Sequence, residues 1–236
     1  MTTNWHTLTS AECATNLDTD INKGLSKQEA SRRLISHGEN ALEQADTQPW
    51  WQLLISQFQD FMIVVLLVAA VISGIIGEAT DALIILIIVV LNALLGAYQA
   101  LRAEKAMAAL RAMASHESYV LRDGHWSFIA SSQIVSGDVI KLDAGNIIPA
   151  DIRLTNGKDV EVDESSLTGE SVGVSKHIDA LKGQVFSTAD QINMLFKGTQ
   201  INRGSVVGIV VATGMQTQLG KIASLLKNAL ERQTPL

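Results

Sequence analysis

Two long apolar runs stand out in the distribution of hydrophobic and polar positions along this chain. Residues 61–77 and 82–101 contain no charged side chain, and only the short segment 78–81 separates them. At 1.5 Å of rise per residue, helices of these lengths measure roughly 26 and 30 Å, close to the hydrocarbon thickness of a bilayer. We therefore predict a transmembrane helix hairpin over residues 60–101. The alternative is a pair of buried core helices, which two such runs in succession disfavour.

The charges that flank the hairpin predict its orientation. Arg102, Lys105 and Arg111 follow the second run closely, whereas segment 78–81 carries only acidic charges. Basic residues favour the cytoplasmic side of a membrane helix. We expect an integral membrane protein whose two termini both lie in the cytoplasm.

The polar region ahead of the hairpin, residues 1–59, has the pattern of short helices. Thr9 and Ser26 are each followed three residues later by a glutamate, which is the spacing of a capping box. The dipeptide His37-Gly38 is typical of a helix end. These signals predict a cytoplasmic helical N-terminal region.

The region after the hairpin begins as a helix and then changes to a β pattern. Helix-forming residues without a breaker continue over 102–117 and predict a stalk. Over 118–215, short apolar runs alternate with turn residues, which is typical of a compact all-β domain. An amphipathic pattern at 216–231 predicts a helix within a C-terminal segment, 216–236. The expected strands lie at 119–129 (a hairpin turning at Asp123-Gly124), 133–135, 138–142, 151–154, 160–162, 194–200 and 206–213, with turns at 156–157 and 203–204.

Composition and charge narrow the classes of function. The chain has 18 basic and 24 acidic residues and a net charge of −6, which argues against a nucleic-acid binder, because such a protein needs a basic face. The single cysteine, Cys13, excludes an internal disulfide and a multi-cysteine metal site. The five histidines have no ligand spacing, so we expect no metal site, and surface or capping roles for His6, His37, His116, His125 and His177.

One motif points to a specific chemistry. Segment 162–171, which reads Val-Asp-Glu-Ser-Ser-Leu-Thr-Gly-Glu-Ser, resembles the signature loop of the actuator domain of P-type ATPases. The tetrapeptide Thr-Gly-Glu-Ser alone is a weak signal, but further motifs follow in the order found in that family. These are Gly-Asp-Val-Ile-Lys-Leu at 137–142, Ile-Pro-Ala-Asp-Ile-Arg at 148–153, Asn-Met-Leu-Phe-Lys-Gly-Thr at 193–199 and Ala-Thr-Gly at 212–214.

The resemblance extends over nearly the whole chain. The N-terminal region is similar to the cation-transporter N-terminal region of type II pumps, through Trp-His-Thr-Leu at 5–8, Gly-Leu-Ser at 24–26 and Gly-Glu-Asn at 38–40. Residues 92–110 resemble the second membrane helix and its stalk. Within the family, the sequence looks most like the calcium-pump branch.

The resemblance implies a fold and a catalytic group. The fold is that of an α+β membrane protein whose β-rich part is an actuator domain, a distorted jelly roll or double-stranded β-helix closed by a helix. Glu170 matches the catalytic glutamate, which orients and helps deprotonate the water that attacks an aspartyl phosphate. Loop-positioning roles are implied for Thr168, Gly169 and Ser171.

The neighbouring acids and the cofactors follow from the same resemblance. Asp163 and Glu164 are interpreted as supports of the loop rather than as bases. No cofactor or metal site is implied in this segment, whereas Mg²⁺ and ATP are implied for a full-length pump.

Parts of such a pump are missing from the sequence. It contains no Asp-Lys-Thr-Gly-Thr string, so it lacks the aspartate that ATP phosphorylates. We therefore interpret the chain as the N-terminal part of a cation pump and expect it not to hydrolyse ATP alone. The resemblance implies that the pump transports calcium. The expected partners are membrane lipid, the phosphorylation and nucleotide-binding domains, the remaining membrane helices and the transported cation. The alternatives are a non-catalytic membrane-tethered binding or regulatory module, and an unrelated membrane-anchored β-domain.

Overall fold

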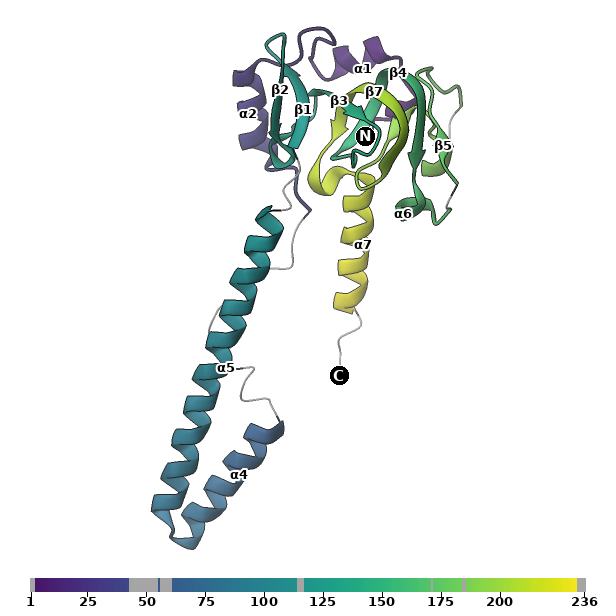
Figure 1. The fold of residues 1–236 in the computed structure, drawn as a ribbon. Coiled ribbons are helices and arrows are strands. Elements are labelled where there is room, and N and C mark those ends of the chain that lie inside the picture. Colours follow the sequence, from purple (N-terminus) through teal and green to yellow (C-terminus); the bar gives the residue numbers. More distant parts are fainter. Residues whose placement is uncertain are drawn as a thin grey trace. The chain divides into compact units, whose positions relative to one another are not determined.

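The structure is a computed structural model, and it describes residues 3–42, 55, 61–113, 117–170, 172–183 and 186–232 (Figure 1). The chain forms two compact units. One consists of Met1–Glu43 together with His116–Leu236, and the other of Gln44–Ser115. The N-terminal region thus belongs to the same unit as the β-rich part of the chain.

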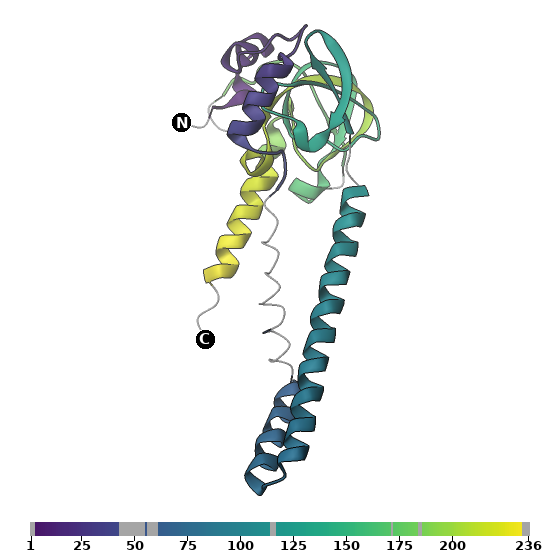
Figure 2. The same cartoon turned by 90° about the vertical axis from the view of Figure 1, so that its left-hand side faces the viewer.

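The apolar unit contains two helices, α4 (Phe61–Ile76) and α5 (Ala79–Met113), which lie side by side in both views (Figures 1 and 2). Two alanines are among the few side chains buried in this unit, and such small residues let helix backbones approach closely. Among the residues of this unit whose burial the structure describes, the buried side chains are Ile63, Ala70, Val89 and Ala93.

The connection between the two helices is a tight reversal. Gly77 has a φ of +96°, and its N–H donates to the carbonyl of Gly74, while the N–H of Glu78 donates to the carbonyl of Ser73. This pair of bonds is a Schellman motif, which satisfies two of the last carbonyls of α4. The turn expected at 78–81 therefore lies about one residue earlier in the chain.

The composition of α5 suits a membrane. Its stretch Ala79–Ala103 is long and apolar enough to cross a bilayer, and only 11% of its most apolar part is buried inside the protein. Helix α4 is also apolar but shorter, roughly 24 Å at 1.5 Å per residue, so its crossing of the membrane stays a prediction. Helix α5 continues to Met113 without interruption, which places the expected stalk and the second apolar run in one helix.

The β-rich unit is built on one antiparallel sheet of seven strands. The strand order is β2-β1-β3-β7-β4-β5, and β6 also pairs with β4. The inner faces of the strands enclose an apolar core that includes Val120, Ile140, Ile152 and Val210. The strands are β1 (Glu117–Arg122), β2 (His125–Ala130), β3 (Val139–Asp143), β4 (Asp151–Asp163), β5 (Val174–Ser175), β6 (Met194–Leu195) and β7 (Gln200–Ala212).

The two longest strands correct the sequence-based prediction. The turns expected at 156–157 and 203–204 do not form, because β4 and β7 run through these positions and pair with each other. The turn-type residues instead produce register shifts within β4, and Asp159 adopts a φ of +50° there. Such bulges bend a strand without ending it.

Other strand predictions had mixed outcomes. The hairpin turning at Asp123-Gly124 is confirmed, and β3 matches the strand expected at 138–142. The strand expected at 133–135 is wrong, because a 3₁₀ turn, η2 (Ser131–Gln133), occupies its start. Of the strand expected at 194–200, only the two residues of β6 and Gln200, the first residue of β7, are in strands.

The N-terminal head covers one face of the sheet. It contains η1 (Trp5–Thr7), α1 (Ser10–Asn16) and α2 (Lys27–His37). Cys13 of α1 packs with Leu121 of β1, and burial raises the pKa of its thiol to about 11. The head therefore supplies part of the core of this unit.

The two capping boxes expected in the head differ. At Thr9 the box is complete, because the Glu12 carboxylate accepts from the Thr9 N–H at 2.8 Å. At Ser26 only half of it forms: the Ser26 hydroxyl accepts from the Glu29 N–H, but the Glu29 carboxylate pairs with Arg33 at 2.8 Å. A cation one helical turn away competes successfully with the N-cap amide.

Arg153 ties separate segments to β4. Its side chain is 0% exposed, and all of its hydrogen bonds go to backbone carbonyls. Nη2 donates to Leu8 at 3.0 Å and to Ile178 at 2.9 Å. Nη1 donates to Leu154 at 2.7 Å and to Asn193 at 3.3 Å. The head and the segments around 178 and 193 thus share one buried cation.

His6 corrects the expectation that the histidines have surface or capping roles. Its side chain is buried, and its ring lies edge-on to Phe186 with 5.4 Å between ring centroids. Burial, followed by the nearby charge of Arg153, lowers the pKa of His6, so the ring is neutral at physiological pH. A neutral imidazole suits this position beside a buried guanidinium.

Helix α7 (Gln218–Arg232) closes the unit, as the amphipathic pattern predicted. The buried Asp151 carboxylate accepts from the Gln218 N–H at 2.8 Å and from the Lys197 N–H at 3.0 Å. An acid at this end also complements the helix dipole. Two further short 3₁₀ turns are η3 (Thr188–Asp190) and η4 (Gly214–Gln216).

Replacing the buried guanidinium should destabilise the β-rich unit. Arg153→Met removes the donors that the carbonyls of Leu8, Ile178 and Asn193 need, and we expect a loss of about 3 kcal/mol in the free energy of unfolding. Denaturant unfolding of the detergent-solubilised chain, followed by tryptophan fluorescence, measures this loss. The exposed Arg203→Met is the matched control and should change stability by less than about 0.5 kcal/mol. Equal midpoints for the two variants would contradict the role given to Arg153.

Candidate functional site

The predicted signature loop connects two paired strands. It leaves β4, forms the short helix α6 (Ser165–Thr168) and returns through β5, which pairs with β4 at Glu161↔Ser175 and Val162↔Val174. Gly169 and Glu170 lie at its exposed tip. Ser171 lies outside the described residues. The loop is therefore held by the sheet at both ends while its tip faces solvent.

Thr168 orders the backbone just before the tip. Its N–H and its hydroxyl both donate to the Glu164 carbonyl, at 3.0 and 3.1 Å. The same hydroxyl accepts from the N–H of Glu170 at 3.2 Å. This pattern of local side-chain to backbone bonds is typical of threonine at the end of a turn. It fixes the backbone at the point where Glu170 begins.

Gly169 reverses the chain between these two residues. Its φ is +77°, in the left-handed region, and its N–H donates to the Ser165 carbonyl at 2.9 Å. A Cβ at this position would meet no atom within 4 Å, so the glycine is required by the backbone conformation and not by lack of space. An open glycine also leaves the backbone accessible to a docking group.

Glu170 is the exposed carboxylate of the loop. Its side chain makes no ion pair with any residue in the described part of the chain. A carboxylate that is fixed at its backbone and free at its oxygens can approach a group on another domain. This is the arrangement that a general base at a domain interface needs.

The two acids ahead of α6 have different surroundings. Asp163 accepts from the Ser165 N–H at 2.9 Å, and hydrogen bonding by Ser165 lowers its pKa. Glu164 is 1% exposed, and its carboxylate pairs with Lys176 at 2.5 Å. Asp163 thus contacts the first residue of α6, and Glu164 contacts Lys176 at the other end of the loop.

Sequence reasoning missed Lys176, although a signal was present. Val160, Val162 and Glu164 alternate on the buried face of β4 and its extension. An acid in that register needs a buried partner, and Lys176 follows directly after β5. The partner was not identifiable without knowing that β5 pairs with β4.

Electrostatics of the pair reflect its burial. Desolvation raises the pKa of Glu164 and lowers the pKa of Lys176, and the attraction between the two charges opposes both shifts. The Lys176 ammonium also lies 5.7 Å from the centroid of the Phe196 ring. Protein atoms therefore surround the pair, whose two side chains are almost completely buried.

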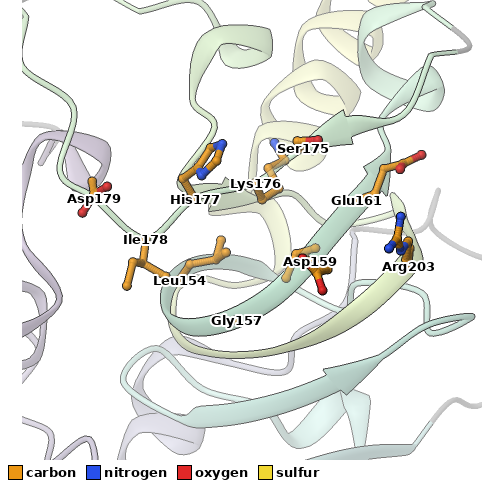
Figure 3. Close-up of a pocket in the computed structure, with 11 residues that line it drawn as sticks. Leu154, Gly157, Asp159, Glu161, Ser175, Lys176, His177, Ile178, Asp179 and Arg203 are labelled. Atoms are coloured by element: carbon orange, nitrogen blue, oxygen red, sulfur yellow. The ribbon is translucent and has the colours of Figure 1, made fainter.

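A pocket of about 380 Å³ lies beside the base of the loop (Figure 3). Figure 3 shows polar and charged side chains on β4 and β7, such as Glu161 and Arg203, and others on the segment after β5, such as His177 and Asp179. None of the lining residues belongs to 168–170. In the described part of the chain, no three His, Cys, Asp or Glu side chains are placed to hold a metal ion.

Comparison with known families identifies the class of protein. Residues 112–227 match the family model of the P-type ATPase actuator domain, and residues 5–73 match that of the cation transporter/ATPase N-terminus. The chain belongs to the P-type ATPase family, as the motifs around the signature loop predicted.

Individual relatives of the chain are named as cation-transporting ATPases. It is 41% identical over 219 residues to a calcium-transporting ATPase of Bacillus subtilis, covering 93% of this chain and 25% of the relative. It is 41% identical over 237 residues to calcium-transporting ATPase 1 of Bacillus cereus, covering 99% of this chain and 27% of the relative. It is 34% identical over 225 residues to sodium/potassium exporting P-type ATPase 2 of Saccharomyces cerevisiae, covering 94% and 21%. The chain spans about a quarter of the length of these relatives.

Removing the cation of the buried pair should destabilise the fold in a pH-dependent way. Lys176→Met leaves the Glu164 carboxylate buried without a partner, and we expect a loss of about 3 kcal/mol at pH 8. Burial holds the pKa of Glu164 above its ordinary value of 4.5. As the pH falls, the Glu164 carboxylate of the folded variant is therefore protonated before that of the unfolded chain. The loss in the free energy of unfolding should therefore be greatest above the raised pKa, where the buried carboxylate is charged. It should disappear below pH 4.5, where Glu164 is protonated in both the folded and the unfolded state.

Unfolding of detergent-solubilised variants at pH 5 and pH 8 measures this effect. The exposed Lys158→Met is the control and should be nearly neutral at both pH values. The double variant Glu164→Gln/Lys176→Met should recover most of the stability, because neither charge remains buried. A loss that is the same at both pH values would show that the unpaired carboxylate is not its cause.

Proposed function

We propose that this chain supplies the actuator function of an ATP-driven cation-transporting P-type ATPase, and that the pump transports calcium. One observation carries the proposal: Glu170 is an exposed carboxylate on an ordered loop, within the segment that matches the actuator family. The relatives named as calcium-transporting ATPases support the choice of cation.

In the proposed reaction, Glu170 acts on water at an aspartyl phosphate. The phosphorylated aspartate belongs to a domain that this sequence does not contain, as do the sites for ATP and Mg²⁺. The carboxylate orients a water molecule and accepts its proton while the water oxygen attacks phosphorus. The bond between phosphorus and the aspartate oxygen breaks in the same step, which releases inorganic phosphate and leaves the aspartate as a free carboxylate. Thr168 and Gly169 hold the backbone in position, and Ser171 is proposed to assist them.

The membrane part of the proposal concerns orientation. We propose that α4 and α5 both cross the bilayer as a hairpin and that both termini lie in the cytoplasm, since basic residues follow the second span. The segments 1–59, 60–101, 102–117, 118–215 and 216–236 then form the cytoplasmic N-terminal region, hairpin, stalk, actuator domain of jelly-roll type and a helix toward further membrane segments. Lipid, the missing catalytic domains and the transported cation are the proposed partners.

A cysteine at the turn of the hairpin tests the orientation. In a Cys13→Ala background, Thr80→Cys should react with a membrane-impermeant maleimide in intact cells, because the turn would face outward. The exposed Ser127→Cys of β2 is the control and should react only after the membrane is opened. Reaction of Thr80→Cys only after opening would contradict the proposed orientation.

Removing the base tests the catalytic role. The variants are assayed in a full-length chimera, in which residues 1–236 replace the matching part of the Bacillus subtilis calcium-transporting ATPase. We expect Glu170→Gln to leave phosphorylation by ATP nearly normal and to slow dephosphorylation 10²–10⁴-fold, because the amide keeps the size of the side chain but cannot accept a proton.

Decay of the radiolabelled phosphoenzyme after a chase with unlabelled ATP measures this change. The exposed Glu117→Gln of β1 is the control and should decay at the parent rate. Glu170→Ala should accumulate phosphoenzyme as well. If Glu170→Gln turned over at the parent rate, the proposed function of this loop would be wrong.

A further inference from the structure

The buried pair of Glu164 and Lys176 joins the two ends of the loop that carries Glu170. Glu164 immediately precedes α6, and Lys176 immediately follows β5. Their charged atoms lie 2.5 Å apart, and their side chains are 1% and 0% exposed. The contact therefore closes the base of the loop, with the exposed tip on the far side of α6.

A continuous set of hydrogen bonds leads from the backbone carbonyl of Glu164 to Glu170. The Glu164 carbonyl accepts from the N–H groups of Leu167 and Thr168, at 2.9 and 3.0 Å, and from the Thr168 hydroxyl at 3.1 Å. That hydroxyl accepts in turn from the Glu170 N–H at 3.2 Å. Glu164 thus contributes its carboxylate to the ion pair and its carbonyl to the hydrogen bonds that order the tip.

Lys176 is itself held in place. Its backbone N–H donates to the Val160 carbonyl of β4 at 2.9 Å. Its ammonium lies near the Phe196 ring, and Leu167 of α6 packs against the cluster that contains the same ring. Lys176 and Leu167 therefore both contact the apolar cluster that contains Phe196.

Stability alone does not account for a buried charge pair at this place. Desolvating two charges costs about as much as their attraction returns, and apolar residues of similar volume are often equally stable. In some proteins a buried polar or charged group, unlike an apolar contact, selects one arrangement of the chain around it. At the base of a catalytic loop, such a requirement determines where the tip lies.

We propose that Glu164 and Lys176 are positioning residues for dephosphorylation, and that their ion pair holds the loop in the geometry in which Glu170 meets the aspartyl phosphate. This inference rests on the proposed function of Glu170. It assigns no contact with the phosphate to either residue, since both side chains are buried.

The test uses the full-length chimera and a double variant that removes both charges. Glu164→Gln/Lys176→Met should keep the unfolding midpoint and the amount of phosphoenzyme formed from ATP near the parent values. Its phosphoenzyme should decay roughly 10- to 100-fold more slowly, since small displacements of a catalytic group have effects of this size. The matched control is Glu117→Gln/Lys158→Met, which removes one exposed acid and one exposed base from the same unit.

A conservative variant separates positioning from simple loss of structure. Lys176→Arg keeps the positive charge opposite Glu164 and should decay within a few-fold of the parent rate. If the phosphoenzyme of Lys176→Arg decays faster than that of Glu164→Gln/Lys176→Met, the result supports the proposal. Equal slowing in both variants, or a loss of phosphorylation that matches the loss of dephosphorylation, would overturn it in favour of a structural role.

The same assay distinguishes the two proposals. If Glu170→Gln decays slowly and the uncharged pair decays at the parent rate, the positioning role is wrong and the function of Glu170 stands. If Glu170→Gln decays at the parent rate, both proposals fail.

Discussion

The buried guanidinium of Arg153 is the interaction on which the arrangement of the β-rich unit depends. An arginine stays charged in a protein, so it can be buried only where acceptors surround its N–H groups. Here the acceptors are carbonyls of the head at Leu8, of β4 itself, and of the segments at Ile178 and Asn193. These parts of the chain must assemble together, because the absence of any one would leave buried donors unpaired. The head is for this reason a component of the unit and not an appendage.

Strand β4 connects this constraint to the loop. It contains Arg153 near its first residue and ends directly before Glu164, and it pairs with β7 over most of its length. A strand that is bonded along one side and closed by an ion pair at its end gives the loop a fixed origin. The loop thus combines a buried base with an exposed tip at Glu170, which suits a carboxylate that must reach a partner domain.

Several polar residues of the family-like motifs have supporting roles of the same kind. Asp151 accepts from the first residues of α7 and from the turn before β7, and burial raises its pKa despite these bonds. Asn40 is buried and donates to the carbonyls of Ser131 and Pro149, while its side-chain oxygen accepts from Lys197 at 2.8 Å. Each connects segments that are distant in sequence, as Arg153 does. The motifs therefore describe an assembled unit around one exposed loop.

The sequence alone determined the features that depend on near neighbours in the chain. The apolar helices, the capping box at Thr9 and the hairpin at Asp123-Gly124 all follow from local patterns of residue type. The signature loop with Glu170 follows from the order of motifs along the chain that resembles the family. The tertiary structure decided the rest. Strands β4 and β7 continue through the turn-type residues at 156–157 and 203–204, because pairing along both strands outweighs the local preference for a turn. It also buried His6 and brought Lys176 to Glu164, since a buried charge or ring is stabilised by partners that only the folded chain brings close.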